Sequence, residues 1–123
     1  MAGRVLGALR GLTATRAEFE ASQERRRVER AGCCPVAQVA DRSRVTVGGV
    51  LRSVTLRSRE TVPALEAELY DGTGTLRLVW LGRREIAGVH PGRRMRVTGL
   101  VCEESGTPTV YNPRYELVAD AER

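Results

Sequence analysis

LEAELYDGTGTLRLVWLG, residues 65–82, decides the fold of this chain. Alternating apolar residues lead up to Asp71-Gly72-Thr73-Gly74 and away from it, which is typical of two half-buried strands joined by a turn. With 71–74 as the loop, one face pairs apolar residues: Leu69 with Leu76, Ala67 with Leu78, and Leu65 with Trp80. The other face pairs Tyr70 with Thr75, Glu68 with Arg77, and Glu66 with Val79. A slip of one residue would exchange the faces, so one register is predicted. We expect positive φ at Gly72 and Gly74.

Outward from this hairpin, the chain from residue 44 onward contains five candidate strands, at 44–57, 63–70, 75–81, 93–102 and 108–118. The first is long and is interrupted by Gly48-Gly49, which predicts a bulge or a sharp bend. A bent first strand can belong to two sheets at once. The segment RREIAGVHPG, residues 83–92, predicts one short helical turn and a loop. These elements predict a mainly β protein with a five-stranded Greek-key barrel, the architecture of the OB fold.

The residues before the barrel have a different character. We predict a charged helical extension over 1–32, a connector over 33–43, the barrel over 44–118 and a tail over 119–123. Thr15-Arg16-Ala17-Glu18 has the spacing of a capping box, so the N-terminal α-helix is expected to start near Thr15. Its Arg25-Arg26-Arg27 run fits a solvated helix end, and it could also contact phosphate.

Composition narrows the class of protein. The 123 residues are 41% hydrophobic and 28% charged, as in an ordinary soluble domain, and carry a net charge of +5. Every basic residue is arginine, and the charge excess permits nucleic-acid binding. No apolar run is long enough to span a membrane, no secretory signal is evident, and the cytoplasm is the expected compartment. Cys33, Cys34 and Cys102 fit free thiols better than a disulfide framework or a zinc site.

Residues 44–118 resemble OB-fold nucleic-acid-binding domains, such as the wedge domain of branch-migration helicases and the anticodon-binding domains of some tRNA synthetases. The matching stretches are VTVGGVL, AELYDGTGTLRLVWLG, HPGRRMRVTGLV and VYNPRYEL. As a whole, the chain resembles small stand-alone OB proteins of G+C-rich bacteria, which carry a short charged helix before the barrel. These motifs are more specific for the fold than for a function, because proteins with the same fold can have many unrelated functions.

The resemblance implies a binding surface on the outer faces of the second and third strands, together with the loops 1–2 and 4–5. Such a surface needs a basic track for the backbone and flat rings on which bases stack. By position it would contain Arg57 and Arg59 in or beside loop 1–2, Tyr70 and Arg77 on the strands, Arg83 and Arg84 after the third strand, and Tyr111 and Arg114 at the start of the fifth strand.

Several candidates have a structural alternative. Arg77 can pair with Glu68 across the strands, Tyr70 and Tyr111 can cover the barrel ends, and the register turns Trp80 into the core. Arg93, Arg94 and Arg96 form a second basic patch on the fourth strand. The acidic pairs Glu66 and Glu68, on the usual binding face, and Glu103-Glu104, in loop 4–5, dilute the positive field.

No catalytic constellation is evident. The only histidine, His90, lies in the turn GVHPG without a nucleophile beside it, and neither a metal nor another cofactor is expected. The sequence therefore favours a non-catalytic module that binds single-stranded DNA or RNA with little sequence specificity. The alternative is a protein-interaction OB module that docks on a larger assembly through its helix or its barrel. The sequence defines no oligomeric state.

Overall fold

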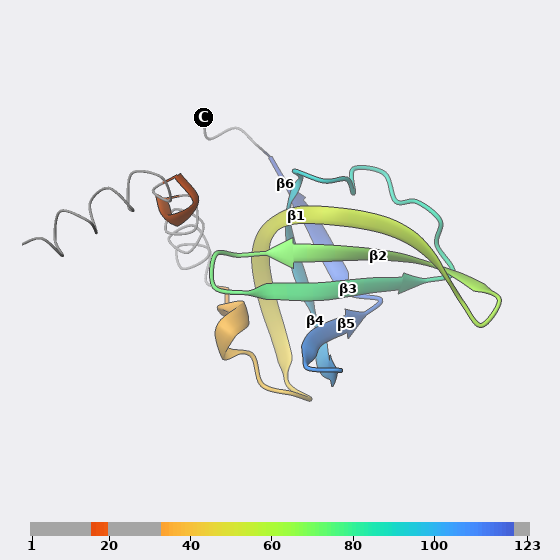
Figure 1. Ribbon diagram of the computed structural model, residues 1–123, viewed down its shortest axis with the longest axis horizontal. Helices are drawn as coiled ribbons and strands as arrows, with labels where there is room; N and C mark the ends of the chain where they lie inside the picture. Colours follow the sequence, from red (N-terminus) through yellow and green to blue (C-terminus); the bar gives the residue numbers. More distant parts are fainter. Residues whose placement is uncertain (1–15, 20–32, 120–123) are drawn as a thin grey trace, which may run out of the picture.

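The computed structural model describes residues 16–19 and 33–119. Residues 16–19 are helical, and the other predictions for the N-terminal extension, including Arg25-Arg26-Arg27, lie outside the described residues. A short 3-10 helix, η1 (Val36–Gln38), precedes the strands. The strands are β1 (Arg44–Arg59), β2 (Val62–Tyr70), β3 (Thr75–Leu81), β4 (Arg94–Glu104), β5 (Thr107–Tyr111) and β6 (Arg114–Val118) (Figure 1). The protein is therefore mainly β.

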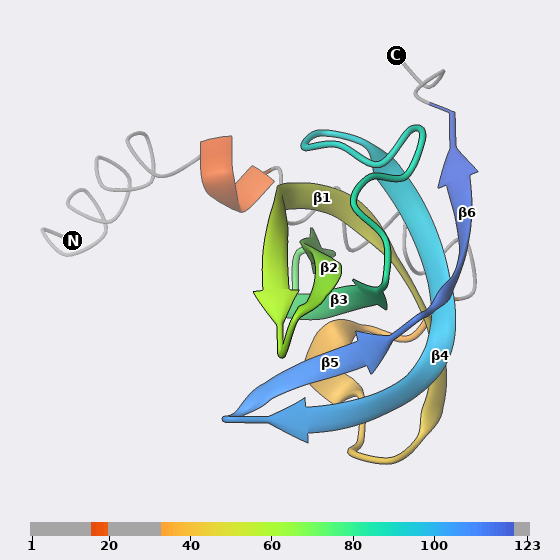
Figure 2. The same ribbon diagram turned by 90° about the vertical axis from the view of Figure 1, so that its right-hand side faces the viewer.

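Five of the strands close into a ring. The sheet order is β1-β2-β3-β5-β4-β6, and β4 also pairs with β1. The β3–β5 pair is parallel, all other pairs are antiparallel, and β6 lies on β4 outside the ring. Figure 2 shows β4 as a long curved strand, with β5 beside its end and β6 beside its beginning. The ring encloses a core that includes Leu51, Leu69, Leu78 and Met95.

The register of the β2–β3 hairpin is the predicted one. All six predicted pairs occur, from Tyr70 opposite Thr75 to Leu65 opposite Trp80. Trp80 is buried, as the register requires. Gly72 has the expected positive φ, at 93°. The prediction for Gly74 was wrong, since its φ is not positive; a Cβ there would lie 3.1 Å from Val36 Cγ1, a tight contact.

Strand β1 belongs to both halves of the ring, as predicted. Its residues 44–50 pair with β4 and its residues 50–59 pair with β2. The register shift lies between Leu51 and Ser53, so the bulge falls at Arg52 and not at Gly48-Gly49. Gly49 instead permits a close approach, because a Cβ there would collide with the backbone carbonyl of Tyr70.

Two predicted elements differ. The predicted fifth strand is divided into β5 and β6 by Asn112, whose φ is 49°, and by Pro113, which has no N–H to donate to a ladder. The predicted helical turn within 83–92 is absent, and turns replace it because Gly88 and Gly92 have positive φ. The connection still closes the core, since Ile86 and Val89 are buried.

The connector before β1 is tied to the ring by the hairpin turn. Asp71 is fully buried, and its Oδ2 accepts a hydrogen bond from the backbone N of Val36 at 2.8 Å. Its Oδ1 accepts from Thr73 N at 2.9 Å, from Thr73 Oγ1 at 2.7 Å and from Gly74 N at 3.1 Å. Thr73 Oγ1 in turn accepts a hydrogen bond from Ala37 N at 3.1 Å. The turn therefore holds η1 against the β2–β3 end of the ring (Figure 1).

Candidate functional site

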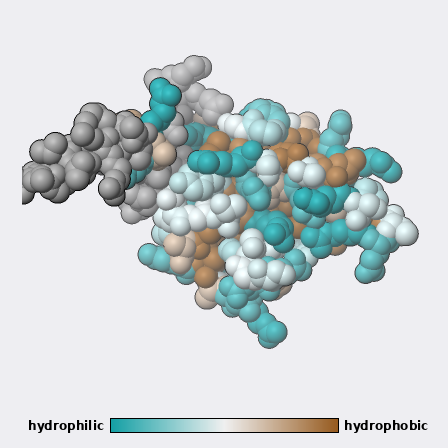
Figure 3. Space-filling model, in the orientation of Figure 1, coloured by the Kyte–Doolittle hydropathy of each residue, from teal (hydrophilic) through white to brown (hydrophobic). Residues whose placement is uncertain are grey.

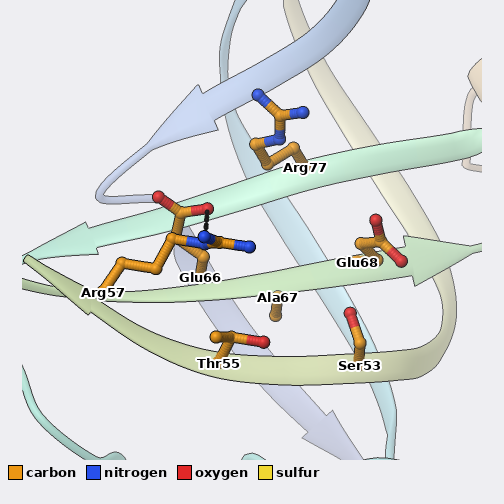
Figure 4. Close-up of a pocket in the computed structure, with 7 residues that line it drawn as sticks. All are labelled: Ser53, Thr55, Arg57, Glu66, Ala67, Glu68 and Arg77. Atoms are coloured by element: carbon orange, nitrogen blue, oxygen red, sulfur yellow. Dashed lines mark ion pairs between the residues drawn. The ribbon is translucent and has the colours of Figure 1, made fainter.

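The outer face of β1, β2 and β3 carries a surface pocket (Figure 4). Its lining is mostly polar and comes from all three strands: Ser53, Thr55 and Arg57 from β1, Glu66, Ala67 and Glu68 from β2, and Arg77 from β3. The alternation of each strand places these polar side chains on the side opposite to the core. The structure thus brings Arg57 and Arg77 to one face, as the sequence predicted.

Glu66 joins two of the predicted arginines. Arg57 Nε lies 3.3 Å from Glu66 Oε1, and Arg59 Nη2 lies 2.9 Å from Glu66 Oε2. Arg59 Nε also donates to Glu66 Oε2, at 3.0 Å. The Glu66 side chain is only 13% exposed, whereas that of Arg57 is 61% exposed. Both oxygens of one carboxylate are therefore engaged by the arginines that a ligand would meet.

Tyr111 extends this cluster to the end of β4. Arg59 Nη1 donates to Tyr111 Oη at 3.1 Å, with the guanidinium carbon 5.5 Å from the ring centroid. The Tyr111 hydroxyl donates in turn to Glu104. That hydrogen bond, together with partial burial, raises the pKa of Tyr111, and the hydrogen bond to Glu66 raises the pKa of Arg59. Arg59 and Tyr111 are thus held in place by acidic partners.

The other end of the same face carries a stacked pair that the sequence analysis missed. The guanidinium carbon of Arg52 lies 3.9 Å from the centroid of the Tyr70 ring, a cation–π contact. Arg52 is exposed because the bulge interrupts the alternation of β1. A sequence signal was available. The buried residues Val47, Gly49 and Leu51 are two positions apart, whereas the next apolar residue, Val54, follows Leu51 by three positions.

Arg77 does not form the predicted alternative pair. It lies directly opposite Glu68 in the register, but no ion pair joins the two side chains within the described residues. Figure 4 shows the Arg77 guanidinium pointing away from the Glu68 carboxylate. Arg77 is half-buried beside β5, where it is opposite Thr109.

The two loops expected to flank the face are tight turns. β1 and β2 are joined by Glu60 and Thr61 alone, with φ of 48° and 76°. β4 and β5 are joined by Ser105 and Gly106, with φ of 50° and 80°. The prediction that Arg57 and Arg59 lie in or beside the first loop agrees with the structure, because both lie in the last three residues of β1. The placement of Glu103 and Glu104 in loop 4–5 was wrong, because these residues end β4.

The remaining candidates lie elsewhere. Arg83 and Arg84 are exposed in the connection between β3 and β4. Arg114 does not share an element with Tyr111, because the predicted fifth strand is divided; Arg114 begins β6 and is opposite Thr98 of β4. It therefore belongs to the second basic patch of β4, where Arg96 Nε lies 3.6 Å from Glu116 Oε1.

Other kinds of site find little support in the part of the chain that the structure describes. No three histidine, cysteine or acidic side chains there are grouped so that they could hold a metal ion. His90 is exposed, and its Nδ1 lies 3.2 Å from the carbonyl oxygen of Pro91. Cys33, Cys34 and Cys102 are free, and burial raises the pKa of the Cys33 thiol. Over these same residues, no helix has the length and the apolar character needed to cross a membrane.

Comparison with known proteins supports the fold of this chain and assigns it to no family. No protein-family model and no curated protein matches the chain. Among solved structures, the chain is similar to part of "Structure of RecG bound to three-way DNA junction", with 22% sequence identity and a TM-score of 0.50. The match covers 67% of this chain and 12% of that chain, so it concerns one small part of the larger protein. At this level of identity the likeness shows a shared fold.

Proposed function

We propose that this protein is a non-catalytic OB-fold module that binds single-stranded DNA or RNA with little sequence specificity. One observation carries the proposal: basic and aromatic side chains from four strands gather on one outer face of the ring. They are Arg52, Arg57 and Arg59 of β1, Tyr70 of β2, Arg77 of β3 and Tyr111 of β5. The ring order β1-β2-β3-β5-β4 and the likeness to part of a protein solved with a DNA junction agree with it.

The chemistry of this face suits a nucleic-acid backbone. An arginine guanidinium can donate two parallel hydrogen bonds to a phosphate, and a tyrosine ring offers a surface on which any base can stack. Because stacking does not depend on the identity of the base, we expect little preference for sequence. Both flanking turns are short, so a ligand would lie along the strands and would not be enclosed by loops.

The affinity should be modest. On this face, four arginines (Arg52, Arg57, Arg59 and Arg77) stand against three glutamates (Glu66, Glu68 and Glu104), which leaves one net positive charge. Figure 3, drawn from the side on which β2 and β3 face the viewer in Figure 1, shows hydrophilic and apolar side chains interspersed there. The salt dependence of binding should grow with the number of arginines that contact phosphate.

The test is a titration of labelled single-stranded DNA and RNA at two salt concentrations. Binding should weaken with salt, with a log–log slope of about −0.7 for each phosphate contact on single strands. The double variant Arg57→Glu/Arg77→Glu should abolish binding. Arg83→Glu/Arg84→Glu is the control of equal charge, because these exposed arginines lie in the connection between β3 and β4 and do not line the pocket; it should retain most of the affinity. A wild-type protein without salt-sensitive binding to either nucleic acid would refute the proposal.

One observation favours the alternative, a protein-interaction module. Val62 and Leu81 lie on the same outer face and are 43% and 42% exposed. Leu81 of β3 is opposite Ala64 of β2, and Val62 lies two residues before Ala64 on β2. Exposed apolar patches that are rimmed by polar residues mark protein-interaction sites when they are large. The titration distinguishes the two functions. A face that only docks on a protein should not bind single-stranded DNA or RNA, and the Arg57→Glu/Arg77→Glu variant would then have no binding to lose.

A further inference from the structure

The arginine nearest to the β1–β2 turn is already occupied. Three nitrogens of the Arg59 guanidinium have partners: Nε and Nη2 contact Glu66 Oε2 at 3.0 and 2.9 Å, and Nη1 donates to Tyr111 Oη at 3.1 Å. Arg57 contacts the other carboxylate oxygen through Nε alone, at 3.3 Å, and its side chain is 61% exposed. The two arginines of one face thus differ in what they can offer to a ligand.

A carboxylate and a phosphodiester bind arginine in the same way, since each presents two negatively charged oxygens to the planar donor fork. A ligand phosphate that approaches Arg59 must therefore compete with Glu66. Arg57 can donate to a phosphate through its terminal nitrogens while its Nε stays on Glu66, whereas the Nε edge of Arg59 cannot. We propose that Glu66 is a built-in competitor for the ligand phosphate, which keeps Arg59 from contacting a bound nucleic acid.

This inference rests on the proposed function and gives it a specific regulator of affinity. Glu66 could also have the opposite effect, by positioning the arginines for the ligand. The contacts favour competition, because Glu66 engages the guanidinium edge that a phosphate would use. The two roles predict opposite signs: removal of a competitor strengthens binding, and removal of a positioning residue weakens it.

The chain supplies a matched control in Glu68. It lies two residues away on the same strand and lines the same pocket, but no ion pair engages it within the described residues (Figure 4). Glu66→Gln and Glu68→Gln change the net charge equally and preserve side-chain shape. A general effect of charge should raise the affinity equally in both variants, whereas release of Arg59 should act only in Glu66→Gln.

The experiment measures fluorescence anisotropy of a labelled single-stranded oligothymidine over a range of salt concentrations. Glu66→Gln should bind about fivefold more tightly than Glu68→Gln, a gain in the upper range for a partly exposed ion pair. Its log–log salt slope should become more negative by about 0.7, because Arg59 adds one phosphate contact. Adding Arg59→Gln to Glu66→Gln should remove the gain, while Arg59→Gln alone should change the affinity little. Urea unfolding of each variant verifies its fold.

The outcomes separate the inference from the proposed function. Equal affinities and equal salt slopes for Glu66→Gln and Glu68→Gln overturn the inference alone, and so does weaker binding by Glu66→Gln. A gain that persists when Arg59 is also replaced overturns it too, because the released residue is then not Arg59. If neither the wild-type protein nor Glu66→Gln binds the oligonucleotide at low salt, the inference and the proposed function both fail.

Discussion

Replacing Asp71 by asparagine should sharply destabilise the fold, although the side chain keeps its shape. The carboxylate is fully buried, and each of its oxygens accepts hydrogen bonds from backbone N–H groups: Oδ1 from Thr73 and Gly74, and Oδ2 from Val36. An asparagine has one carbonyl oxygen and one NH2 group. In either orientation of the amide, the NH2 group therefore faces a buried N–H donor.

The expected cost follows from these contacts. The best orientation keeps the carbonyl oxygen on Thr73 and Gly74 and leaves the N–H of Val36 without an acceptor. A hydrogen bond to a charged group contributes about 1.5–3 kcal/mol, and an unsatisfied buried donor costs about 1–3 kcal/mol. We expect a loss of about 3 kcal/mol, because these costs overlap. For a domain of this size, that loss should lower the Tm by roughly 10–20 °C.

Urea unfolding followed by tryptophan fluorescence measures this loss, because Trp80 is the only tryptophan and is buried. Asp41→Asn is the control, since Asp41 is exposed and accepts one backbone hydrogen bond, from Glu103 N at 2.9 Å. It should cost less than about 1 kcal/mol. If Asp71→Asn is no less stable than Asp41→Asn at an unchanged m-value, the turn does not anchor the connector.

Three further predictions test the turns, the cluster and the close approach. Replacing Glu60-Thr61 by Asn-Gly should stabilise the protein by about 1 kcal/mol, because both residues have positive φ; a lower urea midpoint would contradict this. Glu104→Gln should lower the pKa of Tyr111, so that tyrosinate absorbance appears at lower pH than in the wild type. Folding raises the pKa of Tyr111, so the stability that its protonated hydroxyl contributes is complete below the unfolded pKa of about 10. That stability is lost as the pH rises through the folded pKa, and the urea midpoints of the wild type and Tyr111→Phe should converge at that high pH. Gly49→Ala should cost more than about 2 kcal/mol in urea unfolding, since its Cβ would meet the backbone of β2; wild-type stability would show that the strands can separate without cost.

The hairpin was predictable because two independent signals agree. Apolar alternation on both sides of 71–74 fixes which side chains face the core, and the glycine-containing turn fixes where the chain reverses. Every predicted pair across β2 and β3 is found. The turn between β1 and β2 was not predictable in this way, because Glu60 and Thr61 adopt the conformation that asparagine and glycine usually signal.

For the candidate site, side-chain direction in the strands was predictable, whereas the contacts between side chains were not. Arg57 and Arg59 were predicted only to lie in or beside the first loop. The hairpin register placed Arg77 on the outer face of β3, because side-chain direction follows from local periodicity. The pairing of Glu66 with two arginines depends on side-chain conformations that no local pattern encodes, so Glu66 was predicted only to dilute the positive field. The position of Arg114 was wrong because the break at Asn112-Pro113 ends β5, so that Arg114 begins a separate strand, β6, opposite Thr98 of β4.

The pairing of β1 with β4 has a consequence for the order in which the chain folds. It joins Arg44 to Leu100, whereas the β2–β3 hairpin joins residues separated by a few positions, such as Tyr70 and Thr75. Local hairpins form in about 1–10 μs, while contacts that close long loops bear a larger entropy cost before they gain any contact energy. We expect the β1–β2–β3 meander to form first and closure of the ring on β4 to limit the rate, so that refolding takes milliseconds to seconds.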